Sequence, residues 1–332
     1  MSFVNEQPEA AQGEFASEGL ARCLDASDHA CLETVVKGRD RALGGAVVRR
    51  VLPAIAKRSV GPFIFFDHFG DAGVPAGAGI QVPPHPHINL ATLTYLFEGA
   101  VRHRDSLGSD QVIRPGAVNW MTAGRGIVHS ERNPDEPLGG LHGVQVWLGL
   151  PTEHEEAEPS FEHYPAESIG TTQLPGVSLR VLAGEVYGLS SPVRTRSRLF
   201  YVDAQLEAGA VLDLPCGFSE RAAYVATGRA RARDRAGTSG IRGRELDVSE
   251  MAVFSGGGQP QLVALSAARV MLLGGEPLDG PRHMWWNFAS SSKQRLADAR
   301  AEWRAWPAAT AEELRFRKVP GDDVDFVPLP GA

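Results

Sequence analysis

Short apolar runs recur along most of the chain and predict a protein built from β-strands. Between about residues 45 and 275 they include AVVRRVL, GPFIFFD, ATLTYLF, GVQVWLGL, RLFYVDA and RVMLLGG. Clusters of Gly, Pro, Asn and Asp separate the runs, and the chain holds 37 Gly and 23 Pro. Short strands bounded by turn residues at this spacing are typical of an all-β sandwich or barrel.

One helix interrupts this pattern near the C-terminus. Residues 290–306, SSSKQRLADARAEWRAW, begin with a serine cap and end before Pro307. Leu296, Ala299 and Trp303 lie at helical spacing and would share one face. We therefore expect a short helix in the C-terminal tail.

An internal repeat indicates how the strands are grouped. HPHINLATLTYLFEGAVRHRD (85–105) aligns without a gap with LPCGFSERAAYVATGRARARD (214–234). After a longer loop, VNWMTAGRG (118–126) aligns with MAVFSGGGQ (251–259). Similarity of this kind predicts two barrels related by duplication. The expected divisions are a polar, loosely ordered lead-in (1–40), a first barrel (41–185), a second barrel (186–280) and a tail (281–332).

Composition and charge narrow the class of function. The formal net charge is −7, which argues against direct binding to nucleic acid, because such a partner usually requires a basic face. No apolar run approaches the roughly 20 residues that span a bilayer, and the first residues do not resemble a secretory signal. Cys23, Cys31 and Cys216 do not complete a zinc ribbon, and we expect ordinary thiols. We interpret the chain as a soluble cytoplasmic protein without a membrane partner.

Two pairs of ligand-type residues repeat the spacing that places side chains on one face of a strand. His85 and His87 flank Pro86 just before an apolar run, and His129 and Glu131 follow in GRGIVHSER. Residues i and i+2 of a strand point to the same face. Pro86 cannot donate a ladder hydrogen bond, which places the histidine pair near a strand end or edge. If the two strands are neighbours in a barrel, three imidazoles and one carboxylate converge on its interior.

This set of side chains suits a divalent transition metal. Imidazole with one carboxylate favours Fe, Mn, Ni, Cu or Zn over Ca or Mg. Four protein ligands leave two positions of an octahedral ion open, as catalysis requires. In the aligned second copy the four positions are occupied, in order, by Leu214, Cys216, Leu262 and Ala264. We therefore expect one metal ion per chain, in the first barrel, and a second barrel without metal.

Longer segments of the chain resemble the pirin family of the cupin superfamily. The resemblance extends from about residue 45 to the C-terminus, and WMTAGRGIVHSE is highly specific to the family. It is carried by GPFIFFDHFG (61–70), PHPHINLATLTYLFEG (84–99), PGAVNWMTAGRGIVHSE (115–131) and GGEPLDGPRHMWWNFASSSKQR (274–295). It implies a bicupin, two cupin barrels in tandem. Its N-terminal barrel would bind one iron ion, Fe(II), through the same four residues: His85, His87, His129 and Glu131.

One position departs from the pattern of many pirins. They carry a glutamate four residues after the second histidine of the HPH motif, where this chain has Ala91. In this respect the chain resembles bacterial members with an HPH-x-x-LAT pattern. Because that glutamate is not among the four ligands, metal binding is expected to survive the change. The polarity of the pocket, and with it the substrate, is what the change affects.

The resemblance implies two kinds of function, and the sequence leaves both open. In the first, the protein is a quercetin 2,3-dioxygenase, which opens a flavonol ring with O₂ and releases carbon monoxide. Glu131 would then be the base that takes the flavonol proton. In the second, it is a non-enzymatic iron protein whose oxidation state alters its affinity for a partner protein. A purely structural zinc ion is a third hypothesis, which the open coordination disfavours.

A flat aromatic substrate requires an apolar slot beside the metal. The candidate lining residues are Ile88, Leu90, Trp120, Met121 and His142. His103 and Arg104, in RHRDSLG, are interpreted instead as part of a solvated loop that follows the first strands of the barrel.

Overall fold

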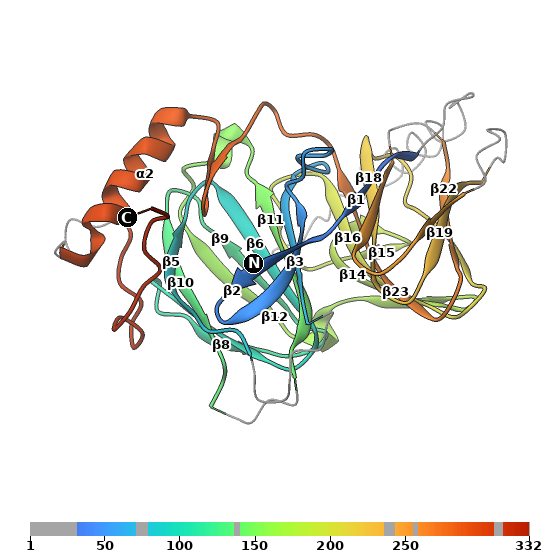
Figure 1. The fold of residues 1–332 in the computed structure, drawn as a ribbon, viewed down its shortest axis with the longest axis horizontal. Helices are drawn as coiled ribbons and strands as arrows, with labels where there is room; N and C mark the ends of the chain where they lie inside the picture. Colours follow the sequence, from blue (N-terminus) through green and yellow to red (C-terminus); the bar gives the residue numbers. More distant parts are fainter. Residues whose placement is uncertain are drawn as a thin grey trace, which may run out of the picture.

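The computed structural model describes residues 32–70, 79–135, 140–235, 243–254, 258–308 and 315–331. Within them the chain forms two β-barrels that lie side by side, with an α-helix on the outer side of the first barrel (Figure 1). Each barrel combines a large sheet with a smaller four-stranded sheet. The prediction of an all-β fold with two barrels is confirmed.

The first barrel contains the strands that carry the predicted ligands. From edge to edge, its large sheet consists of β12 (Ser160–Tyr164), β9 (Val118–Thr122), β6 (Leu90–Glu98), β11 (His142–Gly149), β4 (Phe63–Phe69), β3 (Ala46–Leu52) and β2 (Arg39–Leu43). Its small sheet consists of β5 (Val82–His87), β10 (Ile127–Arg132), β7 (Val101–Asp105) and β8 (Asp110–Ile113).

The second barrel is built in the same way. Its large sheet consists of β1 (Leu32–Lys37), β21 (Glu250–Phe254), β18 (Glu220–Thr227), β23 (Ala268–Gly275), β16 (Leu199–Leu206), β14 (Val177–Val186) and β13 (Thr171–Leu174), with β15 (Leu189–Ser190) paired to β14. Its small sheet consists of β17 (Val211–Asp213), β22 (Pro260–Ala264), β19 (Ala230–Asp234) and β20 (Arg244–Leu246).

The remaining elements connect the barrels or follow the second one. They are the 3₁₀ turns η1 (Thr152–His154), η2 (Ala166–Ser168) and η3 (Trp306–Ala308), the hairpin of β24 (His283–Trp285) and β25 (Phe288–Ser290), and the helix α2 (Lys293–Ala305).

The two barrels share one strand order, as the repeat predicts. In the first barrel β6 lies between β9 and β11, and in the second β18 lies between β21 and β23. The register also corresponds, because Tyr95 of β6 pairs with Val118, and Tyr224 of β18 pairs with Met251. The repeated segments therefore fold into equivalent strands at equivalent levels.

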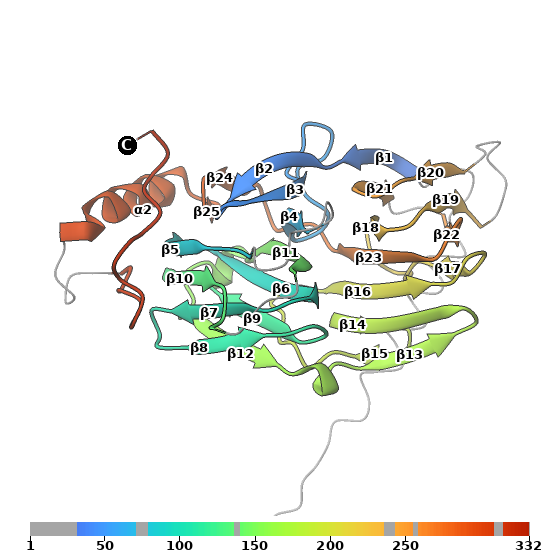
Figure 2. The same cartoon turned by 60° about the horizontal axis from the view of Figure 1, so that its bottom comes forward.

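Two boundaries differ from the divisions expected from the sequence. Residues 32–37, expected in the loosely ordered lead-in, form β1, which pairs with β21 at the edge of the second barrel (Figure 2). Val36 of this strand is buried in the core between the barrels. Residues 171–186, expected in the first barrel, form β13 and β14 of the second. Local pattern identifies strands but not their partners, because the partners are distant in the chain.

The two large sheets pack against each other through apolar faces. Phe66 and Leu93 of the first barrel and Tyr201 and Met271 of the second belong to one buried cluster. Pairing two sheets in this way removes both apolar faces from water, which is the main favourable term in folding.

The polar contacts in this interface are reciprocal. The hydroxyl of Tyr95 donates to Oδ2 of Asp203 at 2.8 Å, and the hydroxyl of Tyr224 lies 2.8 Å from Nδ1 of His68. The register places His68 and Asp203 at equivalent positions of β4 and β16. Each tyrosine thus contacts the same position of the opposite barrel, so the two copies face each other with approximate two-fold symmetry.

The predicted helix is confirmed as α2, which is slightly shorter than expected. Ser292 is its N-cap, and Oγ of this residue accepts a hydrogen bond from the backbone N–H of Arg295 at 3.3 Å. A serine at this position satisfies one of the free N–H groups of the first turn.

The C-terminal arm, meaning the described residues after 280, covers the outer face of β5 and β10 (Figure 1). Leu296 and Trp303 of α2 pack in one cluster with Ile88 and Val128 of the first barrel. The strands that carry the predicted ligands are therefore enclosed on both sides, by the barrel interior and by the arm.

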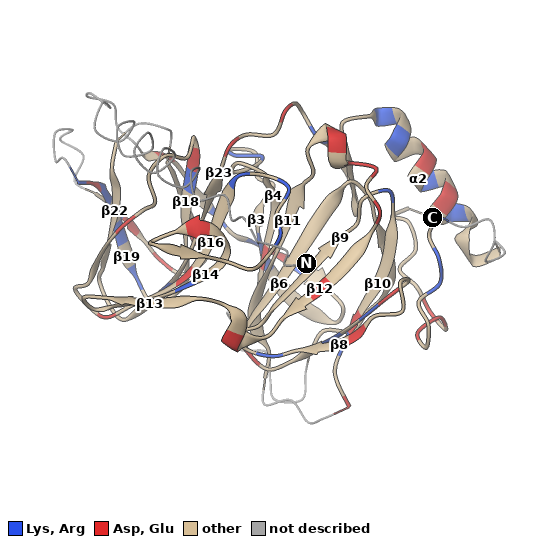
Figure 3. Cartoon of the chain, turned by 180° about the vertical axis from the view of Figure 1, so that it is seen from behind, with Lys and Arg blue, Asp and Glu red and all other residues tan. Residues whose placement is uncertain are grey.

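Charged residues of both signs are interspersed over the barrels and along α2 in the view of Figure 3. Among the helices of the described residues, none is long and apolar enough to cross a membrane. Cys216, expected to be an ordinary thiol, is half-buried and disulfide-bonded. Cys23 and Cys31 lie outside the described residues.

Candidate metal centre

Three histidines meet on the inner side of the small sheet of the first barrel. The His-Pro-His motif ends β5, and His129 lies on β10. The two strands are antiparallel neighbours, and His129 is directly opposite His85. Strand alternation turns His85, His87 and His129 inward, and none of the three is more than 6% exposed.

The three imidazole rings form a compact triangle. Ring centroids are 5.1 Å apart for His85 and His87, 4.3 Å for His85 and His129, and 5.0 Å for His87 and His129. One ring nitrogen from each histidine lies within 4.8 Å of the other two. An ion about 2.1 Å from each nitrogen could bridge this spacing with small ring movements.

Backbone carbonyls fix two of the rings through their Nδ1 atoms. Nδ1 of His85 is 2.9 Å from the carbonyl oxygen of Pro83, and Nδ1 of His87 is 3.0 Å from that of Asn287. A carbonyl oxygen can only accept, so in each pair Nδ1 carries the proton and donates. Nε2 is then left as the atom with a free lone pair, which is the form that binds a metal.

The contacts of His129 also indicate a metal ligand. Nδ1 of His129 is 3.3 Å from Nδ1 of His103, whereas Nε2 of His129 is buried without a hydrogen-bond partner among the described residues. Buried polar atoms are nearly always paired, so an unpaired one requires an explanation. A metal ion at the centre of the triangle would supply the missing partner, and the three histidines fit such an ion.

Burial sets the charge state of the three rings. It lowers the pKa of His85 to about 4 and lowers the pKa of His87 and His129 well below the usual value, with the neighbouring imidazoles adding to the effect. The imidazoles are therefore neutral near pH 7 without metal. Neutral imidazole is the ligand form, so no proton has to be displaced from Nε2 at that pH.

Glu131 lies beside the triangle and makes separate contacts. The register of β10 against β5 shifts between His129 and Glu131, and the glutamate is 6% exposed. Its Oε1 accepts from Nε2 of Gln145 at 2.7 Å, and the same amide donates to Oγ1 of Thr94 at 3.1 Å. Burial raises the pKa of Glu131 to about 7, while the hydrogen bonds from Gln145 and Thr94 lower it. The histidines form the compact cluster, and Glu131 is held next to it by the large sheet.

A row of mostly apolar side chains forms the wall of the barrel next to the histidines. Cross-strand pairing aligns Phe65, Trp147, Thr92, Met121 and Phe161 across the large sheet. Trp147 stacks on Phe65 with centroids 3.8 Å apart, and its ring lies 4.9 Å from that of His87. Trp147 therefore places an aromatic ring against the histidine triangle, and Phe65 packs behind it.

Two of the five predicted pocket residues belong to this wall. Leu90 and Met121 are buried in the same cluster as Phe65 and Trp147. Ile88 instead packs against the C-terminal arm.

The other two lie between the barrels. Trp120 belongs to the inter-barrel core, and its Nε1 donates to Oγ1 of Thr122 at 3.0 Å. Nε2 of His142 lies 2.7 Å from Nε2 of His68 on β4. Alternation explains both positions, because a residue next to an inward-facing one points outward.

His103 is the main feature that the sequence interpretation missed. It was expected in a solvated loop, but it lies on β7 and is 4% exposed. The signal was present, because Val101, His103 and Asp105 alternate with Arg102 and Arg104 as an inner face alternates with a solvated one.

The second barrel lacks this arrangement at the equivalent positions. Asp234, the repeat partner of Asp105, pairs with Pro260, just as Asp105 pairs with His129. Pro260 and Leu262 therefore correspond to His129 and Glu131. The repeat alignment had placed Leu262 and Ala264 there, because it assumed connections of equal length before β10 and before β22. In the structure the connection before β22 is two residues shorter than the one before β10. Neither the sequence repeat nor the strand pairing places a histidine or a carboxylate at the two positions of the second barrel that correspond to His129 and Glu131.

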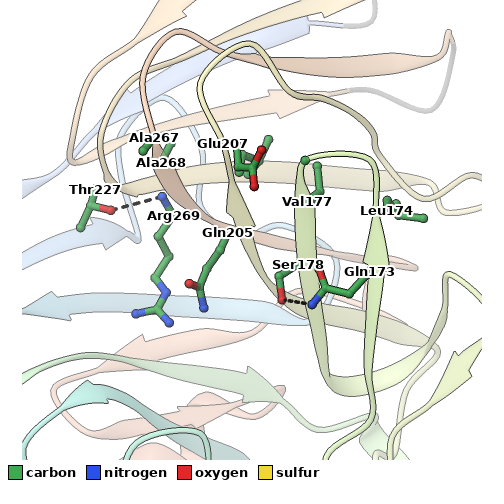
Figure 4. A pocket seen from close by; sticks show the side chains of 12 residues that line it. Gln173, Leu174, Val177, Ser178, Gln205, Glu207, Thr227, Ala267, Ala268 and Arg269 are labelled. Carbon is green, nitrogen blue, oxygen red and sulfur yellow. Dashed lines mark hydrogen bonds between the residues drawn. The ribbon is translucent and has the colours of Figure 1, made fainter.

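A cavity of about 650 Å³ lies in the second barrel, away from the histidines (Figure 4). Residues of β13, β14, β16, β18 and β23 and of the adjoining turns line it, including Ser178, Glu207 and Arg269. None of the four predicted ligands takes part in it.

Comparison with known proteins supports the resemblance noted in the sequence. The sequence model of the pirin family matches residues 45–148, and that of the pirin C-terminal cupin domain matches residues 201–307. A pirin-like protein of Caulobacter vibrioides is 46% identical over 310 residues, which cover 90% of this chain and 99% of that protein. Human pirin is 37% identical over 178 residues, which cover 53% of this chain and 59% of the human protein.

A solved structure shows the same overall similarity. The crystal structure of quercetin 2,3-dioxygenase from Acinetobacter baumannii is 34% identical in sequence and superposes with a TM-score of 0.80. The match covers 90% of this chain and 95% of that structure. With both barrels and the histidine triangle in place, the chain belongs to the pirin family of the cupin superfamily.

Proposed function

We propose that this protein is a mononuclear metal dioxygenase that acts on a flavonol such as quercetin, with O₂ as co-substrate. His85, His87, His129 and Glu131 would hold one Fe(II) ion, and the same donors would also accept Mn, Ni, Cu or Zn. The observation that carries the proposal is the triangle of neutral imidazoles, of which two are fixed through Nδ1 by backbone carbonyls.

The protein side chains would bind and orient the substrate. When bound, the ion supplies a Lewis acid and a redox centre beside the substrate oxygen. The stacked pair of Phe65 and Trp147 offers a flat surface for an aromatic ring next to His87. Glu131 would accept the proton of the flavonol hydroxyl, while Gln145 keeps its carboxyl oriented. The named activity of the A. baumannii relative supports this assignment.

Oxygen consumption tests the proposal directly. Protein loaded with Fe(II) under anaerobic conditions would receive quercetin and then O₂, with the His85→Ala/His87→Ala variant as control. We expect uptake and release of carbon monoxide from the wild type and neither from the variant. No uptake by wild-type protein with stoichiometric iron would overturn flavonol dioxygenation.

One contact favours a second candidate, a redox-responsive protein that binds a partner. The ring of His87 is tied to the backbone of Asn287, and the same arm packs on the outer face of β5. A change at the metal could therefore reach the surface through the arm. Protection of residues 283–305 from hydrogen exchange should then differ between Fe(II) and Fe(III) protein, and equal protection would remove this candidate.

A further inference from the structure

The ring of His129 is held differently from the other two. His85 and His87 contact backbone carbonyls, which have a fixed role as acceptors. His129 instead contacts another imidazole, whose Nδ1 could either donate or accept. Which of these occurs decides whether Nε2 of His129 is free to bind a metal.

The contact with Asp105 determines which ring nitrogen of His103 carries a proton. Oδ2 of Asp105 lies 3.0 Å from Nε2 of His103, and the aspartate is completely buried. An ionised carboxylate can only accept, so Nε2 of His103 must donate to it. In the neutral form of His103, Nδ1 is then the unprotonated ring nitrogen, and it accepts the proton carried by Nδ1 of His129.

The pair is also fixed in place. The ring of His103 stacks on Phe161 with centroids 4.1 Å apart and planes 10° apart. Oδ1 of Asp105 accepts from the backbone N–H groups of Leu107 at 2.9 Å and Ser109 at 3.1 Å. Side chains locked by packing and by hydrogen bonds of this kind hold their geometry without further cost when a ligand binds.

We propose that His103 and Asp105 are positioning residues for the metal ligand His129. The chain Asp105–His103–His129 keeps the proton of His129 on Nδ1 and its Nε2 lone pair directed at the metal position. The inference rests on the proposed metal site and adds to it the residues that select one tautomer of one ligand.

The Asp105→Asn substitution should reverse the direction of both hydrogen bonds that link residue 105, His103 and His129. An asparagine can keep its amide oxygen on Leu107 and Ser109 and turn its NH₂ group toward His103. Nε2 of His103 would then accept, its Nδ1 would carry the proton, and Nδ1 of His129 would have to accept in turn. The proton of His129 would move to Nε2, which then could not bind a metal without first losing it. A wrong tautomer imposed in this way can be very costly even when the geometry is preserved.

Binding of Co(II) to apo protein gives a readout that does not depend on activity. Isothermal titration and the visible absorption of bound Co(II) would be measured for wild type, Asp105→Asn, His103→Phe and the double variant. We expect each single variant to bind about 10- to 100-fold more weakly. The double variant should bind no more weakly than His103→Phe, because Asp105 acts only through His103.

Two further variants separate positioning from general damage. His103→Asn offers an amide oxygen near the place of Nδ1 and should recover part of the affinity lost in His103→Phe. Asp203→Asn changes an equally buried aspartate of the second barrel, which is 2% exposed, and should leave Co(II) binding unchanged. Thermal unfolding of each apo variant tests whether the substitution has left the protein folded.

The outcomes distinguish this inference from the proposed function. If wild-type protein binds no Co(II), or if His85→Ala does not weaken binding, the metal site itself is wrong. If wild type binds and His85→Ala does not, but Asp105→Asn and His103→Phe bind like wild type, only the positioning role is overturned. Additive losses in the double variant would also overturn it, since they would show that Asp105 acts independently of His103.

Discussion

The two barrels have the same strands in the same order, yet their interiors differ at corresponding positions. In the first, the inner face of the small sheet carries four buried histidines, which are the triangle and His103, and a buried glutamate. In the second, Leu212, Leu262 and Ala232 fill the small sheet as part of an apolar cluster. The fold therefore does not require the polar residues. The second barrel shows that this strand arrangement packs with an apolar interior, and the first carries ionisable residues at the corresponding positions.

These ionisable residues are unfavourable for folding by themselves. Burial shifts the pKa of every histidine of the triangle downward and that of Glu131 upward, so each neutral form is favoured. Placing ionisable groups in a barrel without a charge partner costs free energy that an apolar side chain does not. Such a cost at one of two equivalent sites is expected where the residues serve a function.

The largest expected effect concerns metal content. The His85→Ala/His87→Ala variant should lose the single metal ion of the chain, because two of its imidazole ligands are gone. Anaerobic loading with Fe(II) followed by elemental analysis measures this. His154→Ala, a partly exposed histidine of η1, is the matched control and should retain metal. Retention of one ion by the double variant would place the site elsewhere and break the contrast between the barrels.

The second effect concerns stability in the barrel without ligands. Leu262 is fully buried at the position equivalent to Glu131. Leu262→Ala should lower the free energy of unfolding by about 2–5 kcal/mol through lost burial and a cavity. Urea denaturation measures the loss, and Co(II) binding should remain at the wild-type level. A large fall in metal affinity would mean that the barrels are not independent in function.

A third and smaller effect concerns the arm, which covers only the first barrel. Ser292→Ala removes the N-cap of α2 and should destabilise the helix by about 1 kcal/mol. Hydrogen exchange of residues 293–305 should become faster, whereas exchange in the strands of the second barrel should not change. Equal acceleration in both barrels would show that the arm stabilises the whole molecule.

The smallest effect is a pH dependence at the end of the arm. Arg132 of β10 binds Asp322 with contacts of 2.9 and 2.7 Å. Burial alone would raise the pKa of Asp322, but the hydrogen bonds and charge of Arg132 hold it below its usual value. The folded pKa is therefore lower than the unfolded one. The stabilisation is present above about pH 4 and is lost as pH falls through the folded pKa.

This pH dependence can be isolated by substitution. In Asp322→Asn the loss of arm protection between about pH 4 and pH 2 should be smaller than in wild type, and the stability difference at pH 7 should be about 1 kcal/mol or less. Hydrogen exchange of the arm across this range measures it. An unchanged pH profile would show that the contact with Arg132 does not contribute.

Much of the fold and part of the candidate metal site could be predicted from the sequence pattern. Alternation along the chain identified the strands, and the i, i+2 spacing placed His85 and His87 on one face of a strand. The duplicated segments predicted two barrels, and the serine cap predicted α2. The strands and the helix depend on residues close together in the chain, and the duplication on a comparison of two sequence segments, so all of them can be predicted without knowing the fold.

Only the tertiary structure decided what surrounds the ligands. The carbonyl that fixes His87 comes from Asn287, and the imidazole beside His129 comes from another strand, β7. The register of β10 against β5 shifts between His129 and Glu131, and the pairing of β22 corrects which residues replace the ligands in the second barrel. Alternation states which face a residue lies on. It cannot state which distant strand or arm is opposite, because that depends on pairing and packing over the whole chain.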